Sequence, residues 1–226
     1  MLEVQAHQQL KQLLHLEEMP WEHHLTLSRL IGRSLRRQDR TRIRLSAGER
    51  DRWWLGLLVP LCLKSQDCVL VLDERQRQRF LHVELPRLRQ GGLRLACWSG
   101  STAPPGSQLW LLSPAELVNV HRRRGFKPSH QLIIPEAESL AQHLREAMEL
   151  SIETQDWDRL RQAYPTAGPA LLDLHERLSR QLFAASSRST CDLPMPSSAL
   201  VSLRDLIGLL GAAPEPWTEL LTLQPS

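Results

Sequence analysis

Two short apolar runs each end where residues that can do chemistry begin. Residues 132–134 are followed directly by Pro135-Glu136-Ala137-Glu138, and residues 109–112 are followed by Ser113-Pro114 and a helical pattern. A strand, a helix and a second strand that ends in acids form the local plan of an α/β sheet that binds nucleotides at the carboxyl ends of its strands. Glu136 and Glu138 are two positions apart and do not share a helical face. We therefore interpret them as the acidic N-terminus of a helix rather than as a catalytic carboxylate pair.

A second candidate site is the loop of residues 46–50. The alternation in residues 41–45 predicts a strand and residues 51–64 predict a helix. A strand, a small-residue loop and a helix form the context of a phosphate-binding loop. The pattern GxxxxGK[ST] is not met, because the loop has one glycine, no lysine, and no serine or threonine after the glycine. Either the loop only connects its neighbours, or a phosphate is bound by the residues that remain suitable, namely Ser46, Gly48, Arg50 and Arg52.

Charge is distributed unevenly along the chain. Residues 1–130 contain 21 Lys and Arg against 12 acids, whereas residues 131–226 contain 7 against 13. A basic half is typical of a protein with a polyanionic partner such as nucleic acid, although two oppositely charged halves also attract each other. In the predicted helix 24–38 the apolar residues share one face, and the arginines opposite form either a solvated surface or a phosphate-binding one. The arginines that we expect to contact nucleic acid are Arg33, Arg36, Arg37, Arg75, Arg79, Arg122, Arg123 and Arg124.

The order of the predicted elements indicates the fold class and the domains. Predicted strands alternate with helices up to about residue 150, and only helices follow; the strands are 41–45, 68–72, 93–97, 109–112 and 132–134. Such alternation predicts an α/β fold, a parallel sheet flanked by helices, followed by a small all-helical annex. We expect N-terminal helices in residues 1–40, the α/β domain in 41–150, and in 151–226 the helical annex with a Ser/Pro-rich linker and tail.

Several classes of protein are not indicated by the sequence. No segment approaches the ~20 apolar residues of a membrane span, and the N-terminus lacks the pattern of a signal peptide. We therefore expect a cytoplasmic protein without a membrane partner. The four cysteines are scattered without a CxxC pair, which favours free thiols in a reducing compartment. There is no HExxH or GxSxG motif, and we expect no resident metal site.

Four stretches of the chain carry a resemblance to a known family. They are PWEHHLTLSRLIGRSL at 20–35, DCVLVLDERQRQRFLHVELPRL at 67–88, LLSPAEL at 111–117 and QDWDRL at 155–160. With these stretches the sequence resembles the first RecA-like motor domain of superfamily two DNA helicases of the DinG and XPD kind, and most closely the cyanobacterial DinG-like helicases. The resemblance implies a P-loop NTPase fold that binds DNA, and ATP with Mg²⁺.

The resemblance also implies roles for individual residues. In these helicases a strand ends in DEAH or a related motif, whose Asp holds the water shell of Mg²⁺ and whose Glu positions the attacking water. The catalytic acid then corresponds to Glu136, while Pro135 replaces the Asp and Glu138 replaces the His. LLSPAEL resembles a motif that grips the DNA backbone, with Ser113 where Thr is usual, and VLDERQRQ stands at another DNA-contacting motif.

The departures from the family pattern lead to three hypotheses. The phosphate loop is degenerate, the cysteines do not provide the four ligands of an XPD-like iron–sulfur cluster, and we expect no second RecA-like domain after residue 150. The leading hypothesis is a helicase-related, DNA-associated protein whose own ATPase is absent or severely impaired, acting with a partner protein or a second motor subunit. The second is an active ATPase in which Arg50 or Arg52 replaces the lysine of the loop. The third is a structural module that binds other proteins.

Overall fold

The computed structural model describes residues 2–15, 21–45, 52–185, 197–211 and 213–222 of the 226-residue chain. The chain divides into two compact units, Met1–Met148 and Glu149–Ser226. The first unit contains the sheet and the second contains only helices among its described residues, as the element order predicted. No helix in the described ranges combines the length and the apolar composition that a membrane crossing needs.

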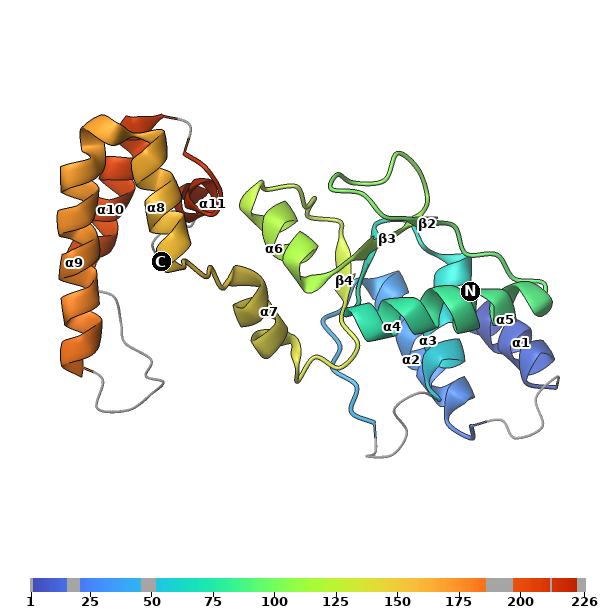
Figure 1. Cartoon of the computed structure of the whole chain (residues 1–226). Helices are drawn as coiled ribbons and strands as arrows, with labels where there is room; N and C mark the ends of the chain where they lie inside the picture. The colour runs from blue at the N-terminus through green and yellow to red at the C-terminus, as the bar shows by residue number, and fades with distance from the viewer. Residues whose placement is uncertain (1, 16–20, 46–51, 186–196, 212, 223–226) are drawn as a thin grey trace. The chain divides into compact units, whose positions relative to one another are not determined.

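The first unit is built around a four-stranded parallel sheet (Figure 1). Its strands are β1 (Cys68–Val71), β2 (Cys97–Trp98), β3 (Leu109–Leu112) and β4 (Gln131–Ile133), in the order β2-β3-β1-β4, and every neighbouring pair is parallel. All residues of β1 and β3 are buried, which explains why both strands are continuous apolar runs rather than alternating patterns. The predicted parallel α/β sheet is therefore confirmed.

Helices cover both faces of this sheet. Because side chains alternate along a strand, Leu70 of β1 lies in one apolar cluster and Val69 in another. The first cluster contains residues from the helices that precede β1 and from the helical run that follows it. The preceding helices are α1 (Leu2–Leu14), α2 (His24–Arg37) and α3 (Trp54–Leu63). The helical run consists of α4 (Glu74–Arg79), the π-helical η1 (Phe80–Glu84) and α5 (Leu85–Gln90), of which η1 and α5 contribute to the cluster. The second cluster contains residues from α6 (Pro114–Arg122) and α7 (Leu140–Met148).

The helical run 74–90 contains a π turn just before its proline. Pro86 has no N–H to donate, and the amide of Leu85 donates to the carbonyl of Phe80, five residues back, instead of four. The irregularity is confined to Phe80–Glu84, just N-terminal to Pro86. The turn places Glu84 inside the protein, where its side chain is 0% exposed.

Two predicted strands differ from the structure. Residues 41–45 form no strand, although Ile43 and Leu45 pack against the first cluster while Arg42 and Arg44 are exposed. The predicted strand 93–97 is reduced to the two residues of β2, and Leu93 and Leu95 are buried without strand pairing. In both segments the alternating apolar side chains are those that pack against the core. An extended segment can bury alternate side chains in this way without pairing with another strand.

The second unit is a small helical assembly with its own core. Its elements are α8 (Thr154–Ala163), the 3₁₀ turn η2 (Pro165–Ala167), α9 (Gly168–Ala185), α10 (Ser197–Leu210) and α11 (Trp217–Thr222). Trp157 packs edge-on against Trp217 with ring centroids 4.6 Å apart, and stacks on His175 at 4.5 Å. The indole N–H of Trp217 donates to the carbonyl of Asp156 at 3.1 Å, so this buried tryptophan satisfies its polar atom.

Candidate functional site

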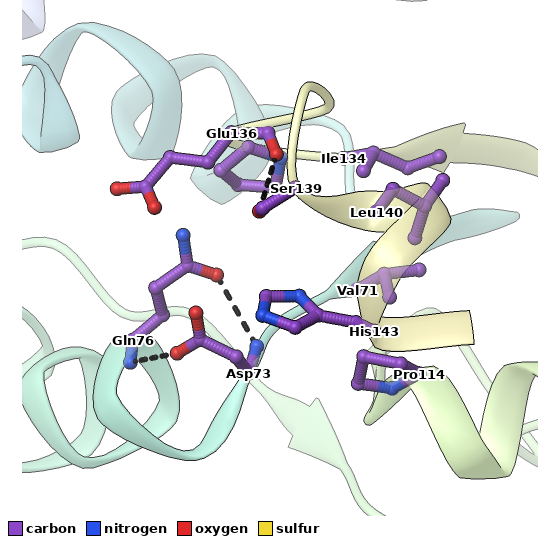
Figure 2. Close-up of a pocket in the computed structure, with 10 residues that line it drawn as sticks. Val71, Asp73, Gln76, Pro114, Ile134, Glu136, Ser139, Leu140 and His143 are labelled. Carbon is purple, nitrogen blue, oxygen red and sulfur yellow. Dashed lines mark hydrogen bonds between the residues drawn. The ribbon is translucent and has the colours of Figure 1, made fainter. Parts of the chain in front are cut away.

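A small crevice lies where the carboxyl ends of β1 and β4 meet. β4 is the neighbour of β1 in the sheet, and the carboxyl edge of parallel strands is where α/β sheets bind ligands. The space enclosed is about 10 Å³, room for about one water molecule. Ten residues line it, and they are drawn in Figure 2: Val71, Asp73, Gln76, Pro114, Ile134, Pro135, Glu136, Ser139, Leu140 and His143.

The wall on the β1 side is a reciprocal helix cap. One carboxylate oxygen of Asp73 accepts from the amide of Gln76 at 2.7 Å, and the side-chain oxygen of Gln76 accepts from the amide of Asp73 at 3.2 Å. This second bond fixes the orientation of the Gln76 amide group, so its nitrogen must face away from the cap. The Gln76 side-chain nitrogen is buried and has no hydrogen-bond partner among the described residues.

The wall on the β4 side is the turn that contains Glu136. Its backbone is left-handed, with φ 50°, and its carbonyl accepts from both the amide and the hydroxyl of Ser139 at 3.0 and 2.9 Å. Its carboxylate accepts from Arg75 at 3.1 Å. Helix α7 begins only at Leu140, so our interpretation of Glu136 and Glu138 as a helix N-terminus is wrong: residues 136–139 form a turn that precedes the helix.

A second reciprocal cap follows β3. The hydroxyl of Ser113 accepts from the amide of Glu116 at 3.1 Å, and the carboxylate of Glu116 accepts from the amide of Ser113 at 2.6 Å. Glu116 also forms an ion pair with Arg77 at 3.5 Å. The hydroxyl of Ser113, which we expect to contact DNA, is thus already engaged in starting α6; its contact with DNA stays a prediction.

The predicted phosphate loop lies almost wholly outside the described residues. Ser46, Gly48 and Arg50 lie outside the described residues, and Arg52 is an exposed turn residue before α3. The strand that should lead into the loop is not formed, because residues 41–45 have no ladder partner. The central strand of the sheet is instead β1, which leads to the Asp73 cap.

The structure gathers three arginines in a hollow that the sequence only partly indicated. Helix α2 ends at Gln38 in the left-handed conformation, with φ 56°. The amide of Asp39 donates to the carbonyl of Ser34 at 3.2 Å, and the hydroxyl of Ser34 donates to the carbonyl of Asp39 at 3.1 Å. The chain therefore turns back on the last turn of α2. The resulting open hollow of about 440 Å³ is lined by Leu30, Arg33, Ser34, Asp39, Arg40, Thr41 and Arg42.

The remaining predicted nucleic-acid contacts are not brought together with this hollow. Arg36 is held by Glu3 at 2.8 Å, and Arg75 by Glu136. Arg79 binds the buried Glu84 at 3.1 Å, which is a role in the core. Four further arginines are exposed: Arg37 at the end of α2, and Arg122, Arg123 and Arg124 at the end of α6. Of the arginines that we expect to contact nucleic acid only Arg33 lines the hollow. Arg40 was considered only as part of the arginine face of the predicted helix, and Arg42 was missed, because the approach of both depends on the turn at Gln38.

Burial moves the pKa values of several groups in the first unit. Burial, with Arg87 nearby, lowers the pKa of His24 to about 4. Burial raises the pKa of Glu84, and the adjacent guanidinium groups of Arg87 and Arg79 partly offset that increase. The described cysteines are free, and burial raises their pKa to about 12 for Cys62 and about 11 for Cys68 and Cys97, so none is a thiolate nucleophile at neutral pH. No group of three His, Cys, Asp or Glu suited to a metal ion occurs among the described residues.

Comparison with known proteins adds no relative. A scan against protein-family models found no match, and searches of curated proteins and of solved structures found no significant match either. The helicase resemblance therefore rests on the four sequence stretches alone.

Proposed function

We propose that this chain is a helicase-related protein that binds the phosphate backbone of DNA through the hollow between α2 and residues 39–42, and that its own ATPase is absent or severely impaired. The observation that carries the proposal is the convergence of Arg33, Arg40 and Arg42 on one hollow. None of the three forms an ion pair among the described residues, and Asp39 is the one acid in the lining.

Other arginines in the first unit are paired with acids. Arg36, on the same helix, is neutralised by Glu3, and Arg75 by Glu136. Arg33, Arg40 and Arg42 keep their charge available in a concave surface. Phosphate oxygens are the natural partners of such guanidinium groups, and every neutralised phosphate releases counterions and makes binding sensitive to salt. A purely solvated arginine face, the alternative, predicts no such binding.

The impaired ATPase is supported by the chemistry of the crevice. Pro135 stands where the resemblance requires an Asp, and the carboxylate of Glu136 is engaged with Arg75. The lining contains the carboxylate of Asp73 and that of Glu136, which is paired with Arg75, but no lysine or arginine, so no lining residue attracts a phosphate group there. The parallel sheet and an acid at the end of β4 support the RecA-like type that we propose for the fold.

The test is a fluorescence-anisotropy titration of the full chain with single- and double-stranded DNA at several salt concentrations. The triple variant Arg33→Gln/Arg40→Gln/Arg42→Gln should bind more weakly, with a salt slope for duplex DNA reduced by about 0.9 for each phosphate that it no longer neutralises. The matched control, Arg159→Gln/Arg177→Gln/Arg180→Gln, removes the same charge from arginines that pair with acids in the second unit. Equal weakening in both variants, or no salt-sensitive binding of the unmodified chain, refutes the proposal.

The second candidate function is an active ATPase, and the position of Glu136 in the crevice favours it. Calorimetric titration with Mg-ATP, with and without single-stranded DNA, separates the two. Micromolar binding together with a turnover that Glu136→Gln abolishes would establish the enzyme. No heat up to millimolar nucleotide would leave the DNA-binding proposal standing alone.

A further inference from the structure

We propose that the crevice between β1 and β4 binds the edge of an uncharged ligand that presents a hydrogen-bond acceptor beside a donor, as a carboxamide or a nucleobase does. The site is separate from the arginine hollow. Ser34, which lines the hollow, accepts from the side chain of Gln131 at the start of β4, whereas Glu136 follows the other end of that strand. The inference therefore does not depend on phosphate binding in the hollow.

The donor that the ligand would satisfy is the side-chain nitrogen of Gln76. Gln76 is 4% exposed, and this nitrogen has no hydrogen-bond partner among the described residues. Buried donors are nearly always paired, so an unpaired one that lines a crevice indicates a missing acceptor. Figure 2 shows the nitrogen pointing toward the Glu136 carboxylate across the open space, with no hydrogen bond between them.

The acceptors are two carboxylates on either side of that nitrogen. One oxygen of Asp73 is used by the helix cap, and the other has no bond to the crevice residues drawn in Figure 2. Glu136 uses one oxygen for Arg75, and its second oxygen has no bond to the other crevice residues drawn. A ligand edge that accepts from Gln76 and donates to a carboxylate would satisfy both kinds of group.

This arrangement excludes the simpler charged ligands. An anion such as phosphate would meet the carboxylate of Asp73 and that of Glu136, which is paired with Arg75, against one neutral donor. A cation would face the N–H of Gln76, which cannot turn its oxygen inward because that oxygen is fixed by the amide of Asp73. The enclosed space of about 10 Å³ admits only an edge, so the body of the ligand would remain outside.

Comparison of the two caps shows that the amide nitrogen is not needed for capping. Glu116 performs the same capping function after β3, where its side chain is 37% exposed and paired with Arg77. A glutamate is therefore able to cap a helix in this fold. What glutamine adds at position 76 is a neutral group and a donor directed into the crevice.

The experiment follows the side-chain NH₂ signals of Gln76 in the ¹⁵N-labelled full chain, identified by their disappearance in Gln76→Glu. The probes are guanosine, cytidine and nicotinamide, with inorganic phosphate and ethylammonium as charged controls. Shifts of the Gln76 signals with the uncharged probes support the proposal. A response to the nucleosides alone identifies a nucleobase as the ligand, and a response to nicotinamide alone identifies a carboxamide.

The variants test whether the donor itself is responsible. Gln76→Glu keeps the capping oxygen but replaces the donor, and should weaken binding, followed by the His143 signal, by at least about tenfold. Glu116→Gln changes the other cap and should bind like the unmodified chain. Should Gln76→Glu not fold, Asp73→Asn keeps a capping oxygen and turns the crevice acceptor into a donor, with the same expected weakening. Three results would overturn the proposal. The Gln76 signals could stay unchanged with every uncharged probe, they could shift equally with phosphate, or binding could be unaffected by Gln76→Glu.

Discussion

Lowering the pH from 7 to 5 should destabilise the first unit because of one histidine. His24 is 1% exposed, its ring lies edge-on to Trp21 at 5.2 Å, and its Nδ1 atom has no hydrogen-bond partner among the described residues. Placing a proton on this ring would create a buried positive charge near the guanidinium group of Arg87. Burial and that guanidinium group accordingly lower the pKa of His24 from 6.5 to about 4.

The size of the effect follows from the difference in pKa between the folded and unfolded chains. The unfolded chain takes up the proton near pH 6.5, whereas folded His24 does so near 4. The stabilising contribution of neutral His24 is therefore complete above pH 6.5 and decreases progressively as the pH falls toward 4. The expected decrease of unfolding free energy is about 2 kcal/mol between pH 7 and 5, and about 3 kcal/mol when the whole contribution has gone.

Hydrogen exchange of the β1 amides in the full chain measures this decrease for the first unit alone. Between pH 7 and 5 the opening free energy of the unmodified chain should fall by about 2 kcal/mol more than that of His24→Gln, which has no group to protonate. His82→Gln, which replaces an exposed histidine in the same unit, should behave like the unmodified chain. An equal fall in the unmodified chain and in His24→Gln would refute the reasoning, because intrinsic exchange and the other titrating groups are shared by both.

Two further substitutions test interactions inside the first unit. Arg87→Met removes one of the two guanidinium groups that neutralise the fully buried Glu84, and should lower the unfolding free energy by about 2 kcal/mol in urea titrations, since one charged hydrogen bond is lost and Arg79 remains as the partner of the buried carboxylate. A decrease below about 1 kcal/mol would show that Glu84 is protonated in the fold. Ser113→Ala removes the oxygen that caps α6 and should cost about 1 kcal/mol, whereas Ser113→Thr should cost much less. Equal stability of the two Ser113 variants would contradict the capping role.

The central strands were predictable because their burial is complete. A parallel strand covered on both faces must be apolar at every position, and β1 and β3 show such runs within the predicted 68–72 and 109–112. Segment 41–45 was not predictable in the same way. Its alternation places Ile43 and Leu45 against the core, and that requirement is met by an extended segment whose amides do not pair with the sheet.

Only one side of the candidate crevice, the one that contains Glu136, was predictable from the sequence. Acids after the strand 132–134 were expected at the carboxyl edge of the sheet, and Glu136 is indeed found there. The pattern of Asp73 followed three residues later by Gln76 is a readable helix cap, yet nothing local indicates that Gln76 is buried. Its burial and its unsatisfied nitrogen arise from the turn around Glu136, some sixty residues further along the chain, which no local pattern reports.

The two ends of β4 have side chains of opposite charge nearby. This difference bears on whether the chain binds nucleic acid in the hollow or a nucleotide in the crevice. Near Gln131 lies the hollow lined by three arginines; beyond Ile133 lies a crevice lined by two carboxylates and by no lysine or arginine. A motor domain of the kind that the sequence resembles needs phosphate chemistry at the carboxyl end of its strands. In this chain the groups suited to phosphate lie at the amino end of β4 instead. We therefore propose a strand of nucleic acid in the hollow rather than a nucleotide in the crevice, and the salt slope of DNA binding compared with the heat of Mg-ATP titration tests this proposal.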